Sequence, residues 1–357
     1  MDDVRVERAA KIRWRRFPAC LAVGMSLVFP SPPVSAQTAA EFYKGKTVKI
    51  IVGFGVGGGY DVYARMLAPY LRDVLQTTVI VENQPGAGGL SALNRLYAAQ
   101  PDGLQLMLIS GIAATMSQLV GQQGVAYDLS KVGHLGIVSA SPWMWLGQPN
   151  NPAMMTPADA MKPGVTLNWG ASGQIDGTAD GGAITCTVLK LNCKVVLGYK
   201  GTAEIALAIE RREMDAMYVS DTSANLYVRS GQNRAIATMA RNKSQFFPDT
   251  PTIFELVTLN AEQEWWFDFR STLDALGRVL VTTPGVPPDR LAYLQNAVGR
   301  IVTNPKLLAE AEKSQRYVIY RDPKAAQQAI ERVINAPTPA QRAEIKDIVL
   351  NRYSSSR

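Results

Sequence analysis

Histidine and cysteine are scarce in this chain, which has one histidine and three cysteines in 357 residues. Zinc sites need several nitrogen or sulfur ligands, and a Ser-His-Asp triad needs a histidine base. Either site would have to use His134, which lies in a predicted strand and is more simply a structural residue. The phosphate-loop motif GxxxxGK with Ser or Thr is missing, as is GxSxG. We expect no metal, no cofactor and no enzyme activity, with a His134-dependent exported hydrolase as an alternative.

Basic clusters and long apolar runs are also scarce after residue 36. The formal charge is +7, but residues 1–36 hold six basic and three acidic residues, which leaves +4 for the remainder. No Lys/Arg cluster with interleaved aromatic residues occurs there, so nucleic acid is not an expected partner. No later stretch is apolar and long enough to cross a membrane.

The first 36 residues have the layout of a signal peptide. Four basic residues between Lys11 and Arg16 precede a run of 13 mostly apolar residues, and Val34-Ser35-Ala36 supplies small residues before a cut. We predict cleavage near Ala36 and export to the periplasm, with an uncleaved anchor as the alternative. Cys186 and Cys193 are then the only remaining cysteines, and either a disulfide or two buried thiols would fit an oxidising compartment.

Two strands that run into glycine-rich turns dominate the N-terminal half. The β-branched run Val48–Val52 precedes GFGVGGG, and Val79–Val81 precedes ENQPGAGG. A helical pattern follows each turn, although Pro69 predicts a kink or an early end in the first helix. The first amide groups of a helix lack internal partners and lie at the positive end of the dipole. Glycines let a ligand approach those amides, so the paired turns predict an anion site, although glycines also serve in tight turns.

A dinucleotide site is an alternative interpretation of the first turn. Gly53 to Gly58 fits GxGxxG, and Glu82 ends the next strand, where a ribose-binding acid would stand. Export argues against free nicotinamide cofactors, and the second glycine turn is not part of that motif.

Strands and helices alternate through most of the remaining chain. Expected strands include 104–109, 135–138, 165–169, 195–197, 216–219 and 279–283, and most end in Gly, Ser, Thr or Asp. Such alternation predicts an α/β fold with parallel sheets and helices on both faces. Ligands then bind outside the carboxyl ends of the strands, where Ser110 also lies.

The ordered set of motifs resembles the periplasmic receptors of tripartite tricarboxylate transporters, the Bug/TctC family. The resemblance rests on FYKGKTVKIIVGFGVGGGYD, VIVENQPGAGGLSALNRLYAAQPDG, GASGQIDGTA, VVLGYKGTAEIALAIERREMDAM and TTPGVPPDRLAYLQNAV. It implies a two-domain, type II-like Venus-flytrap binding protein with crossing hinge strands. The implied domains are 37–140 plus 263–357, and 141–262, after the signal peptide 1–36.

The resemblance also implies a site. The ligand would be a small carboxylate, such as a di- or tricarboxylate or an aromatic acid, captured by domain closure. The partners would be membrane transporter subunits, and the chain would be a monomer. An exported ligand sensor for a signalling system is an alternative. The implied ligand-binding residues, with Ser110 added from the strand pattern, are Gly57, Gly58, Gly59, Asp61, Gly86, Ala87, Gly88, Gly89, Ser110, Ser172, Gly173, Thr178, Lys200, Gly201 and Asp221.

Two positions depart from the family pattern. Val56 stands where proline is frequent, and Gln174-Ile175-Asp176 replaces small residues. Asp176 would repel an anion unless it points away, so an amide or hydroxyl group of the ligand could lie near it.

Overall fold

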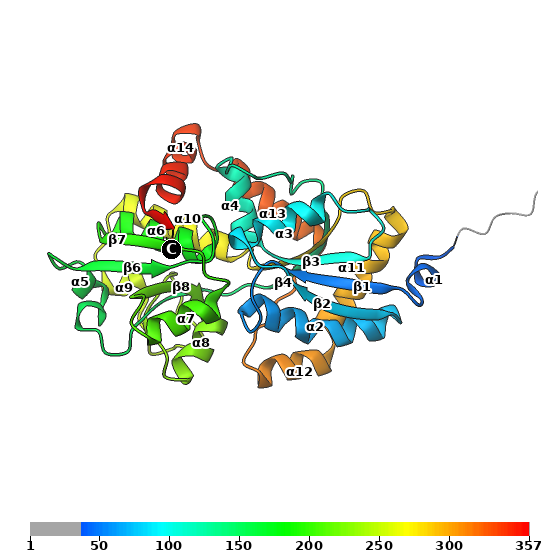
Figure 1. The fold of residues 1–357 in the computed structure, drawn as a ribbon, viewed down its shortest axis with the longest axis horizontal. Helices are drawn as coiled ribbons and strands as arrows, with labels where there is room; N and C mark the ends of the chain where they lie inside the picture. The colour runs from blue at the N-terminus through cyan, green and yellow to red at the C-terminus, as the bar shows by residue number, and fades with distance from the viewer. Residues whose placement is uncertain (1–36, 357) are drawn as a thin grey trace, which may run out of the picture. The chain divides into compact units, whose positions relative to one another are not determined.

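Two sheets organise the residues that the computed structural model describes, 37–356 (Figure 1). The first sheet has the strand order β2-β1-β3-β10-β4. Its strands are β1 (Thr47–Val52), β2 (Thr78–Asn83), β3 (Gln105–Ser110), β4 (Gly133–Ser139) and β10 (Arg278–Thr282). β1 is parallel to β2 and β3, with Ile50 opposite both Val81 and Leu106, whereas β10 is antiparallel to β3 and β4.

The second sheet has the order β11-β7-β6-β8-β5-β9. Its strands are β5 (Trp143–Gly147), β6 (Thr166–Gly170), β7 (Asn192–Leu197), β8 (Ala216–Ser220), β9 (Arg234–Thr238) and β11 (Ser354–Ser356). β6 is parallel to β7 and β8, and β5 is antiparallel to β8 and β9. The predicted α/β fold is therefore confirmed. The prediction of parallel strands is wrong for β5 and β10, which run antiparallel to their neighbours. Each of these strands enters its sheet after the chain has crossed from the other sheet.

The chain crosses between the sheets three times. It passes from β4 to β5 through residues 140–142 and returns from β9 to β10. The C-terminal strand β11 then pairs with β7 in the second sheet, although the expected division assigns residues 263–357 to the first domain. The signal-peptide prediction, residues 1–36, lies outside the described residues.

Helices cover both faces of the first sheet. Ile50, Leu106 and Leu280 pack toward α2 (Gly59–Leu75) and α11 (Pro288–Val302) in one buried cluster. Ile51 and Met107 alternate to the other face, which α3 (Leu90–Tyr97), α4 (Gly111–Leu119) and α13 (Pro323–Asn335) cover. Because side chains alternate along a strand, burial of both faces explains the nearly continuous apolar runs. α2 continues through Pro69 to Leu75, so the predicted early end is wrong.

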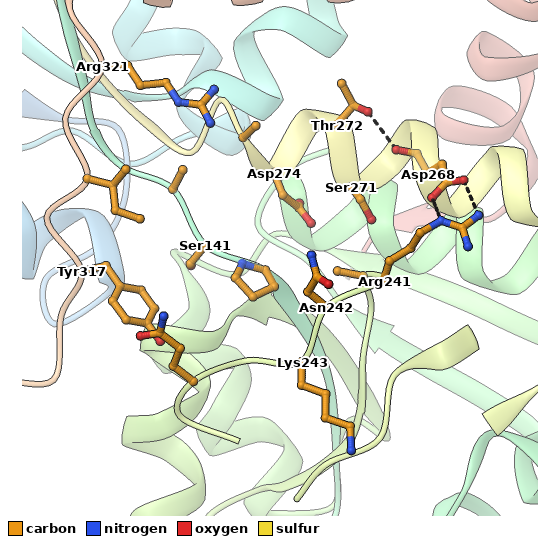
Figure 2. A pocket seen from close by; sticks show the side chains of 16 residues that line it. Ser141, Arg241, Asn242, Lys243, Asp268, Ser271, Thr272, Asp274, Tyr317 and Arg321 are labelled. Atoms are coloured by element: carbon orange, nitrogen blue, oxygen red, sulfur yellow. Dashed lines mark hydrogen bonds and ion pairs between the residues drawn. The ribbon is translucent and has the colours of Figure 1, made fainter. Parts of the chain in front are cut away.

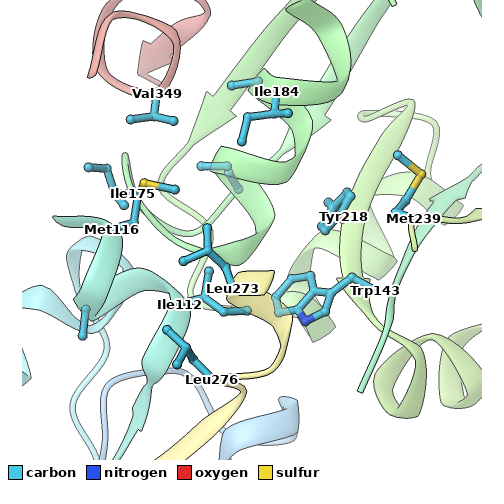
Figure 3. Close-up of a cluster of buried hydrophobic side chains, with 14 of the residues drawn as sticks. Ile112, Met116, Trp143, Ile175, Ile184, Tyr218, Met239, Leu273, Leu276 and Val349 are labelled. Carbon is cyan, nitrogen blue, oxygen red and sulfur yellow. The ribbon is translucent and has the colours of Figure 1, made fainter. Parts of the chain in front are cut away.

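The second sheet is covered in the same way. α7 (Thr202–Glu210) and α8 (Asp221–Arg229) lie on one face, and α6 (Gly177–Val188) with α10 (Ala261–Asp274) lies on the other. Figure 3 shows that the cluster around α6 and α10 is continuous from Ile112 and Met116 of α4 to Tyr218 of β8. A disulfide joins Cys186, in α6, to Cys193, in β7, which resolves the open alternative.

The remaining elements are short or peripheral. They are α1 (Ala39–Tyr43), η1 (Ala87–Gly89), η2 (Pro152–Met154), α5 (Pro157–Ala160), α9 (Ile253–Leu256), α12 (Pro305–Lys313), α14 (Pro339–Asp347) and η3 (Ile348–Arg352). No helix within residues 37–356 combines the length and apolarity that a membrane crossing requires.

Candidate functional site

The glycine loops of the first sheet contact the loops of the second sheet. The Gly55 amide donates to the Lys200 carbonyl at 2.7 Å. A Cβ added to Gly173 would lie 2.3 Å from the Gly88 amide nitrogen, and one added to Gly88 would lie 2.9 Å from the Ile175 carbonyl oxygen. Only residues without side chains allow this approach. The structure thus brings together the loops that the sequence singled out.

Several helices begin at these loops without a side-chain cap. α2 follows Gly58, α3 follows Gly89 at a φ of 93°, and α7 follows Gly201, and none of these residues can cap the helix. Their first amides lack the usual oxygen partner from a serine, threonine or aspartate. By contrast, the Ser110 hydroxyl accepts from the Ala113 amide and caps α4. The uncapped starts are the ones that can receive an anion.

A cavity of about 30 Å³ lies between these loops. Five expected residues line it: Gly58, Gly59, Ser110, Ser172 and Thr178. The other lining residues are Phe54, Tyr60, Trp143, Asp176, Gly177 and Thr202. A smaller cavity of about 10 Å³ adjoins Gly88 and Gly89 and shares Phe54 and Ser110 with the first. Such volumes hold roughly a water molecule or two, so the loops must separate to admit a ligand.

The remaining expected residues lie beside the cavity or away from it. Gly57, Gly86 and Ala87 are exposed. Asp61 is 2% exposed and turns into its own loop, where it accepts from the Gly57 amide at 2.9 Å and pairs with Arg65.

Asp221 does not line the cavity either. It is fully buried and accepts from the Ser244 hydroxyl at 2.7 Å.

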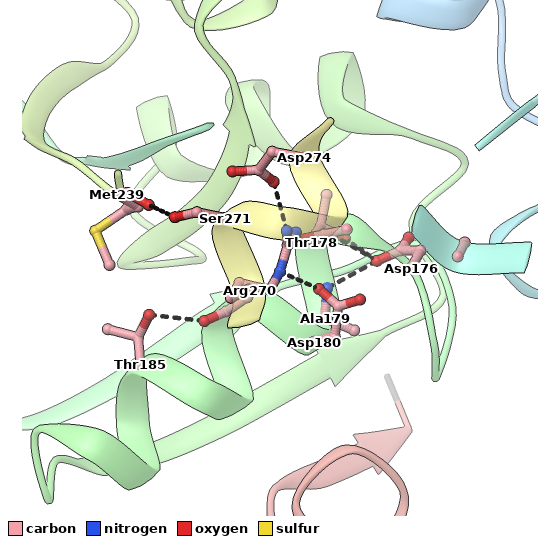
Figure 4. A network of polar contacts seen from close by, with 12 residues as sticks. Asp176, Thr178, Ala179, Asp180, Thr185, Met239, Arg270, Ser271 and Asp274 are labelled. Carbon is pink, nitrogen blue, oxygen red and sulfur yellow. Dashed lines mark hydrogen bonds and ion pairs between the residues drawn. The ribbon is translucent and has the colours of Figure 1, made fainter. Parts of the chain in front are cut away.

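Asp176 caps α6 with its own carboxylate. It accepts from the amides of Thr178 and Ala179 at 2.8 and 2.7 Å, and from the hydroxyls of Thr178 and Ser172 (Figure 4). Both carboxylate oxygens are therefore occupied. The negative charge lies at the positive end of the helix rather than in open space, which is the favourable place for it.

A buried ionic network supports the cavity wall behind Asp176. Arg270 is 1% exposed and pairs with Asp180 at 2.9 Å and with Asp274, while its Nη2 donates to the Gly177 carbonyl at 3.2 Å (Figure 4). Its guanidinium also faces the Trp143 ring at 5.2 Å. Burial raises the pKa of Asp180 to about 6 and that of Asp274 to about 7, against the opposing effect of Arg270. The network holds two residues that line the cavity.

Sequence reasoning did not select Tyr60, Trp143 or Arg278 as site residues. Arg278 is 4% exposed, and its Nη2 donates to the Ser220 hydroxyl at 3.1 Å. The sequence contains one signal for Arg278, because this cation stands directly before the apolar run Val279–Val281. No local pattern indicates the tertiary contacts that make this cation unusual.

A larger cavity lies next to the crossing at residues 140–142 (Figure 2). It has a volume of about 770 Å³, and none of the expected site residues lines it. Arg241 in its wall is already paired with Asp268 at 2.6 Å and with Glu264 at 2.8 Å. Arg321 also lines this cavity and forms no ion pair within residues 37–356, so the choice of the glycine loops rests on their uncapped helix starts.

The alternatives based on metal or histidine find little support. Within residues 37–356, no cluster of histidine, cysteine, aspartate or glutamate could hold a metal ion. A ring nitrogen of His134 lies 2.8 Å from the Leu129 carbonyl oxygen, and burial lowers the pKa of the ring. These contacts suit a structural residue.

Comparisons with known proteins find chains and structures that are similar to this one. A UPF0065 protein of Bordetella pertussis is 27% identical over 275 residues, which cover 76% of this chain and 81% of that protein. The structure of the periplasmic binding protein BugD has a TM-score of 0.70 at 22% identity and covers 87% of this chain and 99% of its own. The malate-bound structure of MatC from Rhodopseudomonas palustris has a TM-score of 0.67 at 21% identity, with 85% and 98% covered.

The structural likenesses confirm the two-domain binding-protein fold. The family model "Tripartite tricarboxylate transporter family receptor", TctC, matches residues 63–339, which is more than half of the chain. The chain therefore belongs to the TctC family of tripartite tricarboxylate transporter receptors.

Proposed function

We infer that this chain captures a small carboxylate between the loops of its two sheets and delivers it to membrane transporter subunits. The single observation that supports this most is the meeting of uncapped helix starts, α2 and α3, with the loops after β6 and β7. The family consists of solute receptors, so the expectation that the chain is not an enzyme is confirmed by its membership.

The ligand's carboxylate would accept hydrogen bonds from the first amides of α2 and from the glycine loop before α3, near Gly88. A charge-assisted hydrogen bond contributes roughly 1.5–3 kcal/mol, so three or four would supply on the order of 6–8 kcal/mol before ordering costs. That approaches the roughly 8 kcal/mol of a micromolar complex. The malate bound by MatC, which shares the fold, belongs to the same chemical class.

Capture would proceed by closure of two lobes. The expected division gives residues 37–140 with 263–357, and residues 141–262, hinged at the crossings. Because α10 and β11 pack on the second sheet, they would move with the second lobe. A ligand that contacts both lobes favours the closed form by the difference in its affinity for the two forms. The receptor would act as a monomer in the periplasm, after removal of residues 1–36.

Gly88→Asp tests the placement of the ligand. The variant puts a side chain and a negative charge into the space between Gly88 and Asp176, where a Cβ would already lie 3.0 Å from the Asp176 Cβ. A thermal-shift screen of the mature chain with di- and tricarboxylates, aromatic acids and amides would identify a ligand. Calorimetry should then detect no binding to the variant.

Gly231→Asp is the matched control. Gly231 also has a positive φ, of 78°, but a Cβ there would meet nothing within 4 Å. We expect this variant to keep the affinity of the unmodified chain. Unchanged affinity in Gly88→Asp would show that the ligand is held elsewhere.

A further inference from the structure

Arg278 is a buried cation without an acidic partner. It is 4% exposed, and none of the ion pairs among residues 37–356 includes it. Its Nε also lacks a hydrogen-bond partner in that part of the chain. Arg270, equally buried, pairs with two aspartates. A guanidinium that leaves water without a counter-charge destabilises the protein, so Arg278 calls for an explanation.

Arg278 lies at the edge of the first sheet where the glycine loops begin. It is the first residue of β10, opposite Ser110 of β3 and Ser139 of β4, which are the last residues of their strands. Its guanidinium faces the rings of Tyr60 and Tyr63 at 5.1 and 4.4 Å. Tyr60 lines the small cavity, so only one ring separates Arg278 from it.

Hydroxyl groups from both sheets surround this guanidinium. Nη2 donates to Ser220, at the end of β8, and Nη1 lies 3.5 Å from the Ser139 hydroxyl. A Cβ on Gly59 would lie 2.7 Å from Nη2 and 2.6 Å from the Ser223 hydroxyl. Ser220 and Ser223 belong to the second lobe, so separating the lobes would withdraw them and expose the cation to the cleft.

The surrounding potential is also positive. α2 begins at Gly59 without a side-chain cap, whereas the first residue of α8, Asp221, places its carboxylate at the start of that helix. Arg316 is a second buried arginine, 9% exposed, whose Nη1 donates to the Thr222 carbonyl at 2.9 Å. Burial and the charge of Arg278 lower the pKa of Arg316. Asp221 is the acid of this region, but it forms no ion pair with Arg278. Two guanidiniums and the N-terminus of α2 together favour an anion between them.

We propose that Arg278 pairs directly with the carboxylate of the ligand and determines that the receptor selects anions. The inference rests on the proposed function and adds a charge-paired contact to the backbone amides of the glycine loops. Arginine presents two parallel N–H groups that match the two oxygens of a carboxylate, which a serine or a backbone amide alone cannot offer.

Calorimetry with Arg278→Gln and Arg278→Lys tests the proposal, with sodium malate, adipate and benzoate as probes. We expect Arg278→Gln to weaken the tightest-binding probe about 10- to 100-fold, which corresponds to one lost charge-assisted contact. Arg278→Lys should lose less affinity than Arg278→Gln. Arg300→Gln, on the exposed side of α11, is the charge-matched control and should bind like the unmodified chain.

The melting temperature without ligand separates this role from a structural one. Because Arg278 forms no ion pair within residues 37–356, Arg278→Gln should melt at the same temperature as the unmodified chain or higher. An affinity within twofold of the unmodified chain, or a clear drop in the ligand-free melting temperature, would overturn the proposal. If Gly88→Asp abolishes binding while Arg278→Gln does not, the proposed function stands and this inference fails. If the unmodified chain binds none of the probes, both fail.

Discussion

Asp221 shows how a single buried carboxyl group can couple this fold to pH. It is fully buried, and burial raises its pKa from 3.8 to about 6. The Ser244 and Ser141 hydroxyls, the Thr222 amide and the Arg278 charge favour the ionised form but do not offset the burial. The folded state therefore binds the proton more tightly than the unfolded state, so stability declines as pH rises from about 4 to above 6.

Asp221→Asn should remove this component of the pH dependence. A shift of about two pKa units corresponds to roughly 3 kcal/mol, present near pH 4 and lost above pH 7. We expect the asparagine variant to gain stability relative to the unmodified chain as pH rises through that range. Urea unfolding at pH 4.5, 6 and 8 would measure it. Asp180 and Asp274 also titrate, so the relevant quantity is the difference in unfolding free energy between the variant and the unmodified chain. If this difference does not change with pH, the assignment to Asp221 is wrong.

Helix starts differ in function at the scale of the element. α4 and α6 are capped by Ser110 and Asp176, whereas α2, α3 and α7 follow glycines. The starts of α4 and α6 need no ligand, because a side-chain oxygen already accepts hydrogen bonds from their amides. The starts of α2, α3 and α7 have no side-chain cap, although at the start of α3 the Gly89 and Leu90 amides donate to the Gly86 and Ala87 carbonyls. Asp176, which the sequence suggested as a repulsive group for the ligand, is thus a structural cap.

Asp176→Ala should lower the free energy of unfolding by about 1 kcal/mol, the usual effect of losing an N-cap. Asp176→Ser keeps a capping oxygen and should recover most of the loss. Chemical denaturation of the two variants would compare them. Equal stability of all three proteins would mean that the cap contributes nothing measurable to α6.

Local patterns predicted most strands and glycine loops, but not how distant elements pair. The run Val48–Val52 indicated a buried strand, because β-branched residues suit a sheet covered on both faces. The aromatic run at 265–269 lies in α10, where Trp266 and Phe267 are core residues. The position of β11 and the isolation of Arg278 depend on contacts between residues far apart in sequence. Neither periodicity nor turn chemistry carries that information.

At the scale of the whole molecule, two sheets joined by three crossings place their loops face to face. The loops of the two sheets meet closely and leave cavities of only about 30 and 10 Å³, so binding requires the lobes to part and close again. The larger cavity of about 770 Å³ near the first crossing would admit a ligand without such motion. The space between the glycine loops and the larger cavity are therefore two alternative binding places for a carboxylate.

A crystal structure of the mature chain with a carboxylate identified by thermal shift is the most direct test. The proposed function predicts that the carboxylate oxygens lie within hydrogen-bond distance of the first amides of α2, near Gly59, and of the glycine loop before α3, near Gly88. A carboxylate bound instead in the larger cavity, against Arg241 or Arg321, would contradict it.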